Sequence, residues 1–205
     1  SDSYFCLALQ GPEAPRLLGQ HLNTSVNSFQ LETLNDIIVS GTGYTGERGC
    51  EIIGPLNQIE IHWESLVDMG AIPIGLGARD TLRLEKGYLL SGQDFKGTET
   101  TLETNYAWVI DWNHEFIGRE ALVSQKQNNY SKLSGILLED KGVLRPGCSV
   151  YYENNKVSEL TSGSLSPILR KGIGLSYLNL DIDSEVTIEV RGKHLNGRVV
   201  RTPFL

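Results

Sequence analysis

Apolar positions in the first half of the chain change their spacing several times, which predicts a mixture of strands and helices. The mainly apolar run Tyr4–Leu9 is typical of a strand, and the residues after Gly11-Pro12 follow a helical period. Short strands are also predicted at Asp36–Ser40 and Cys50–Ile53, where they form a hairpin or a β-loop-β unit. We therefore expect an α+β domain over about residues 1–115.

Two more helices are predicted in this domain. Asn57 with Glu60 three residues later resembles a capping box, and the helix that follows ends at Gly70. Another helix fits from about Ala78 to Lys86, followed by a glycine that ends it. The polar, turn-rich segment 91–105 is where we place the domain junction.

From about Leu133 onward the pattern alternates with a period of two. Val150–Tyr152 and the residues after a polar turn predict a hairpin, and Val186–Val190 alternates strictly between apolar and polar positions. Short strands and turns at this spacing are typical of a small barrel or sandwich. The fold class is therefore α+β, with an all-β C-terminal domain, a barrel or sandwich, over about residues 125–205.

Composition and charge narrow the possible partners. Hydrophobic residues make up 40% of the chain, but no stretch approaches the roughly 20 apolar residues of a membrane helix. The start of the chain does not resemble a secretion signal, so we expect a cytoplasmic protein without a membrane partner. The net charge is −7 and Lys and Arg do not cluster, which argues against a nucleic-acid partner.

Cysteine and histidine positions do not predict a metal site. The three cysteines are far apart in the sequence, as are the four histidines, and no pair has the spacing of metal ligands. Because Cys6, Cys50 and Cys148 have apolar neighbours, we expect them to be buried as small apolar side chains in a reducing compartment.

The glycine-rich segment 41–51 is the most distinctive part of the sequence. Its four glycines either bring backbone N–H groups close to a ligand or form a cluster of turns. Neither a P-loop nor a dinucleotide fingerprint fits, since no Lys-Ser pair and no helix follows. Glu51 is either the solvent-facing member of an alternating strand or a partly buried acceptor for a ligand with two adjacent N–H donors.

Several other side chains have two readings. Arg79, Arg83 and Lys86 share one helix face, either as a solvated stripe paired with acidic neighbours or as a clamp for an anion or carbonyl. Tyr44 and Tyr88 are either aromatic walls for a planar ligand or ordinary packing residues. Asp94 is either a turn acceptor or an acid/base group. Trp108 and Trp112 are expected to pack in a core or domain interface.

Five colinear blocks of sequence match one known family. The matching patterns are LQGP at Leu9–Pro12, TGYTGE-x-G-x-EI at 42–52, GLGARD-x-LRLE at 75–85, FIGREAL at Phe116–Leu122, and TSG-x-x-SP-x-L-x-KGI at 161–173. They cover nearly the whole chain. The chain resembles the T-proteins of the glycine cleavage system, which are tetrahydrofolate-dependent aminomethyltransferases.

The resemblance implies a fold, a reaction and a set of site residues. Members of the family surround a central folate pocket with three domains. They take an aminomethyl group from the lipoyl arm of the H-protein, release ammonia and form 5,10-methylenetetrahydrofolate, with tetrahydrofolate as co-substrate. By motif, Glu51 would hold the pterin edge, Arg79 would contact folate, and Tyr44 and Tyr88 would be aromatic walls.

The resemblance also implies that the catalytic group lies elsewhere. The catalytic aspartate of the family precedes the LQGP block, so no catalytic residue is expected in these 205 residues, and their activity by themselves stays open. Two alternatives remain, a folate-dependent demethylase and a non-catalytic folate-binding module. The known modules resemble a KGC-x-x-GQE signature, whereas Lys86–Asp94 lacks the cysteine and ends in aspartate.

Overall fold

The computed structural model describes residues 2–205. They form two compact units that divide between Leu82 and Arg83, each with its own hydrophobic core. Residues 83–115, which we grouped with the N-terminal domain, belong to the same compact unit as the C-terminal strands. The domain boundary between about 115 and 125 stays a prediction.

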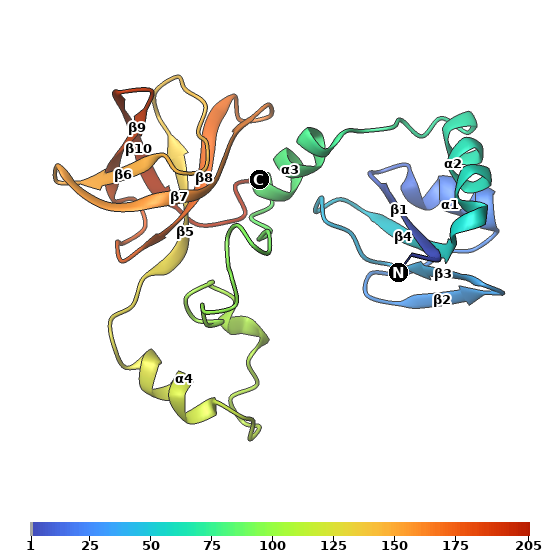
Figure 1. Ribbon diagram of the computed structural model, residues 1–205, viewed down its shortest axis with the longest axis horizontal. Coiled ribbons are helices and arrows are strands. Elements are labelled where there is room, and N and C mark those ends of the chain that lie inside the picture. The colour runs from blue at the N-terminus through green and yellow to red at the C-terminus, as the bar shows by residue number, and fades with distance from the viewer. Residues whose placement is uncertain (1) are drawn as a thin grey trace. The chain divides into compact units, whose positions relative to one another are not determined.

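The first unit contains a four-stranded antiparallel sheet with the order β1-β4-β3-β2 (Figure 1). Its strands are β1 (Tyr4–Gln10), β2 (Leu31–Leu34), β3 (Ile37–Ser40) and β4 (Gly49–Pro55). The predicted pairing of the two strands around the glycine-rich segment is confirmed, because β3 and β4 are antiparallel neighbours. Strand β2 was not predicted, since most of its side chains are exposed and give no period.

Two helices pack against one face of this sheet (Figure 1). Helix α1 (Ala14–Leu22) and helix α2 (Ile59–Asp68) contribute Leu17, Leu18 and Leu66 to the core. A 3-10 turn (Leu56–Gln58) precedes α2, whose start carries no side-chain cap, so the predicted capping box does not form. The alternating strands bury Leu9, Val39, Cys50 and Ile52 against these helices.

The second unit is built on a closed barrel of six antiparallel strands in the order β10-β5-β8-β7-β6-β9 (Figure 1). The strands are β5 (Lys132–Leu138), β6 (Ser149–Tyr152), β7 (Asn155–Ser166), β8 (Lys171–Leu178), β9 (Glu185–Val190) and β10 (Lys193–Val200). Closure removes the exposed sheet edges that a sandwich would keep. The predicted all-β C-terminal region is confirmed, and it is a barrel.

Helix α3 (Leu76–Glu85) confirms the helix predicted near Ala78–Lys86, and helix α4 (Arg119–Lys126) lies in the second unit. A short 3-10 helix (Ala107–Val109) lies between them and carries Trp108. The prediction that Trp108 packs in a core is wrong, because 79% of its surface is exposed. No helix within residues 2–205 is long and apolar enough to cross a membrane.

Candidate functional site

Glu51 lies on the face of the sheet that points away from α1 and α2. It belongs to the central strand β4, where it is opposite Ala8 of β1 and Ser40 of β3. Its strand neighbours Cys50 and Ile52 are fully buried on the helix side, so the alternation of the strand turns Glu51 to the other face. The side chain is half-buried there, which favours the partly buried acceptor over a freely solvated strand residue.

One hydroxyl group binds the carboxylate of Glu51, and a second hydroxyl group binds the first. Thr42 Oγ1 donates a hydrogen bond to Glu51 Oε2 over 2.5 Å, and Ser40 Oγ lies 2.8 Å from Thr42 Oγ1. Within residues 2–205, Glu51 Oε1 receives no side-chain hydrogen bond. One oxygen of the carboxylate is therefore anchored, and the other can accept hydrogen bonds from a ligand. Sequence reasoning missed both hydroxyls.

Gln10 ties the glycine-rich loop to the sheet. Its Nε2 donates to the carbonyl oxygens of Thr42 and Cys50, over 3.2 and 3.0 Å, and its Oε1 accepts from Thr45 Oγ1 over 3.2 Å. A Cβ added at Gly43 would lie 2.0 Å from Gln10 Oε1, and one at Gly49 would lie 2.3 Å from the carbonyl oxygen of Leu9. Gly49 is needed for close packing of the chain against itself, and Gly43 leaves room for the Gln10 amide, which supports the turn-cluster reading.

Tyr44 extends from the same loop and contacts Arg79. The guanidinium carbon of Arg79 lies 4.5 Å from the centre of the Tyr44 ring, which is the geometry of a cation–π contact. Arg79 is exposed near the start of α3, and Tyr44 is only two residues from Thr42. The loop thus carries both Thr42, which donates to Glu51, and Tyr44, which contacts Arg79. A concave surface shared by Glu51 and Arg79 stays a prediction.

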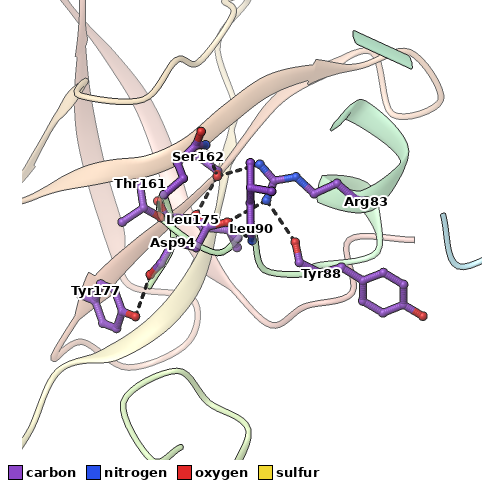
Figure 2. A network of polar contacts seen from close by, with 9 residues as sticks. Arg83, Tyr88, Leu90, Asp94, Thr161, Ser162, Leu175 and Tyr177 are labelled. Atoms are coloured by element: carbon purple, nitrogen blue, oxygen red, sulfur yellow. Dashed lines mark hydrogen bonds and ion pairs between the residues drawn. The ribbon is translucent and has the colours of Figure 1, made fainter. Parts of the chain in front are cut away.

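Arg83 is not part of a cationic stripe with Arg79 and Lys86. It is the largest fully buried side chain of the described residues, with 1% of its surface exposed. Its Nη1 donates to Asp94 Oδ2 over 2.7 Å and its Nη2 to Ser162 Oγ over 2.8 Å, inside the second unit (Figure 2). Both predictions for Arg83, a solvated stripe and a clamp for an anion or carbonyl, are therefore wrong. The side chain instead anchors the structure of the second unit.

Asp94 completes this buried network (Figure 2). Its carboxylate accepts hydrogen bonds from Arg83, the backbone N–H of Leu90, and the hydroxyls of Thr161 and Ser162. The bond to Leu90 confirms the turn acceptor. Tyr177 donates to the backbone oxygen of Asp94, and burial, followed by the nearby carboxylates, raises the pKa of Tyr177 to about 12.

Tyr88 lies in the second unit. Its backbone oxygen accepts a hydrogen bond from Arg83 Nη1 over 3.0 Å, and its ring points away from the buried network (Figure 2). The residue as a whole is half-buried. Its role as a wall of the same site as Glu51 stays a prediction.

The cysteines differ from one another. Cys50 is buried, and burial followed by the charge of Glu51 raises its pKa to about 11. Cys148 is partly buried. The prediction that Cys6 is buried is wrong, because β1 places it on the outward face with Ala8, where it is exposed. The nearly uniform apolar run of β1 gave no sign of which face Cys6 would occupy.

A pair of histidines joins α1 to α2. His21 Nε2 lies 2.8 Å from His62 Nδ1, and Ser65 Oγ lies 3.0 Å from His21 Nδ1. Burial lowers the pKa of both rings; a charge on His62 lowers that of His21 further, while Asp36 opposes the shift at His62.

A groove of about 270 Å³ on α2, lined by Ile59, Glu60, Trp63 and Glu64, contains none of the predicted site residues.

Comparison with known proteins places the chain in a family. Residues 1–114 match the family model described as the GCVT N-terminal domain, and residues 132–205 match the glycine cleavage T-protein C-terminal barrel domain. An aminomethyltransferase of Alcanivorax borkumensis is 42% identical, over 97% of this chain and 58% of the relative. That of Halothermothrix orenii is 39% identical, over 100% of this chain and 62% of the relative.

A solved structure gives the same result for the fold. The crystal structure of the glycine cleavage system aminomethyltransferase T from Bartonella henselae matches with a TM-score of 0.91 and 28% sequence identity. The match covers 98% of this chain and 60% of that one, so the chain spans about three-fifths of the length of its relatives. Since the first family model alone matches more than half of the residues, the chain belongs to the glycine cleavage T-protein family.

Proposed function

We propose that the chain supplies the tetrahydrofolate-binding part of a glycine cleavage aminomethyltransferase. The reaction moves an aminomethyl group from the lipoyl arm of an H-protein to tetrahydrofolate and releases ammonia. Family membership and the names of the relatives support this proposal. No sequence or structural feature of the described residues favours a demethylase over an aminomethyltransferase.

The half-satisfied carboxylate of Glu51 is the observation that carries the proposal. A pterin ring presents adjacent N–H donors along one edge, and a carboxylate is the side chain that accepts two such donors at once. Thr42 uses one lone pair of Oε2, which leaves Oε1 and a second lone pair of Oε2 for the ligand. The open face of the sheet gives a flat ring access to this group.

Arg79 and Tyr44 supply the remaining interactions in this proposal. A guanidinium donates through a planar fork, which suits a ring oxygen or a carboxylate of folate. Tyr44 supports the guanidinium from one side over 4.5 Å and leaves the other side for the ligand. Tyr88 would add a second aromatic surface, which an aromatic ligand stacks upon.

Calorimetry with tetrahydrofolate tests the proposal. We compare the wild-type chain with Glu51→Gln and Arg79→Ala, and we expect each substitution to weaken binding by about 1.5–3 kcal/mol, the range for hydrogen bonds to charged groups. Arg16→Ala is the matched control, because Arg16 is exposed on α1 and pairs with Glu13. Equal affinity of all four proteins would show that Glu51 and Arg79 are only surface residues.

A further inference from the structure

The hydrogen-bond chain that ends at Glu51 has a fixed direction. An ionised carboxylate only accepts hydrogen bonds, so the single hydroxyl proton of Thr42 must point to Glu51 Oε2. Thr42 Oγ1 then has no proton left for Ser40 and must accept the hydroxyl proton of Ser40 over 2.8 Å. The two hydroxyls therefore act in series, and the carboxylate is the acceptor at the end of the series.

The two ends of the bond between Thr42 and Glu51 are held by one side chain. Gln10 Nε2 donates to the carbonyl of Thr42 on the loop and to the carbonyl of Cys50, the residue before Glu51. The backbone segments that carry the donor and the acceptor are thus bound by the same side-chain amide, although Thr42 and Glu51 are nine residues apart in the sequence. A carboxylate fixed in this way does not need to become ordered when a ligand arrives, which lowers the entropic cost of binding.

We propose that Thr42, supported by Ser40, is a positioning residue that orients the Glu51 carboxylate toward a ligand with paired N–H donors. The inference rests on the proposed tetrahydrofolate site and extends it to residues that need not touch the ligand. Thr42 acts through Glu51 in this arrangement, so its effect on binding must disappear when the carboxylate is removed. That dependence separates positioning from a general structural role.

A double-mutant cycle tests this dependence, with tetrahydrofolate as the probe and the 205-residue chain as the protein. Thr42→Val keeps the shape of the side chain but cannot donate, so we expect affinity to fall about three- to ten-fold, the range of one hydrogen bond. In the Glu51→Ala background, which leaves no side-chain acceptor for the Thr42 hydroxyl, the same substitution should change affinity less than about two-fold. Thr42→Ser should restore most of the wild-type affinity.

A control variant and a second assay distinguish the possible outcomes of this cycle. Thr33→Val makes the same change at an exposed position of β2 and should bind like the wild type. The same cycle measured by urea unfolding should show that Thr42→Val and Glu51→Ala are non-additive, whether or not folate is present. Additive losses in both assays, or a Thr42→Ser variant as weak as Thr42→Val, would overturn the positioning role. A wild-type chain that does not bind tetrahydrofolate would overturn the proposed function instead.

Discussion

The carboxylates of Glu51 and Asp94 lie in different units and show two uses of the same chemical group. Asp94 is fully buried and accepts four hydrogen bonds, one of them from the equally buried Arg83. Glu51 is half-buried and accepts one side-chain hydrogen bond, from Thr42. A carboxylate whose lone pairs are occupied holds structure together, whereas one with unused acceptors on an open face is available to a ligand.

The largest loss of stability is expected at Asp94, the carboxylate that accepts four hydrogen bonds. Asp94→Asn keeps the size of the side chain but leaves the Arg83 guanidinium buried without a counter-charge, and its amide cannot accept from every donor around it. We expect the second unit to lose about 3–5 kcal/mol of stability, the cost of breaking a buried ion pair. Hydrogen exchange of peptides from β7 and β8 measures the loss. A change below about 1 kcal/mol, no more than an ordinary neutral hydrogen bond, would contradict the structural role.

The sequence indicated the fold well wherever local periodicity decides it. Strand β9 alternates between apolar and polar side chains, so its period was visible, and β1 was recognised from its run of apolar residues. Arg83 was misplaced because it lies four residues after Arg79, a spacing that also describes a solvated helix face. Its burial depends on Ser162, 79 residues away, and no local pattern reports such a partner.

The residues of the candidate site also differ in whether the sequence could predict them. Motif spacing identified Glu51 and Arg79, and the contact of Arg79 with Tyr44 lies between segments that the sequence does not place together. Ser40 and Thr42 were passed over because a serine and a threonine beside glycines are typical of turns. Only the pairing of β3 with β4 brings these hydroxyls to the carboxylate.

The next effect is a dependence of stability on pH that should differ between the two units. In the first unit the pKa values of His21 and His62 are lowered, so the unfolded state takes up protons first as the pH falls below about 6.5. The stability that the neutral pair contributes is present above that pH and is lost as the pH falls toward the lowered pKa values. The loss is at most about 1.4 kcal/mol per pH unit for each histidine.

Urea unfolding of the first unit between about pH 7.5 and 5, a range that spans the ordinary histidine pKa, measures this loss. His62→Gln removes one titrating ring and should make the pH dependence less steep. His194→Gln is the matched control, because His194 is exposed on β10, where it contacts Tyr151. If His62→Gln and the wild type show the same pH dependence, the pair does not couple to folding.

Alkaline pH should act on the second unit instead. The pKa of Tyr177 is raised to about 12, so the unfolded state releases its proton first once the pH exceeds about 10. The contribution of the neutral phenol is present below about pH 10 and is lost as the pH rises toward about 12. Tyr177→Phe should abolish this dependence while it removes the hydrogen bond to Asp94. An ultraviolet titration that gives an ordinary tyrosine pKa would contradict the assignment.

The smallest effect on stability is expected at Glu51, and this sharpens the comparison with Asp94 most. Glu51→Gln makes the same chemical change as Asp94→Asn, since each replaces a carboxylate by an amide of equal size. The amide oxygen introduced by Glu51→Gln still accepts from Thr42, and the new N–H₂ group faces the open side of the sheet, where water can satisfy it. We therefore expect less than about 1 kcal/mol of change in the unfolding of the first unit, measured by hydrogen exchange of peptides from β1 and β4. A loss as large as that of Asp94→Asn would mean that Glu51 is a structural carboxylate as well, and its unused acceptors would then no longer argue for a ligand.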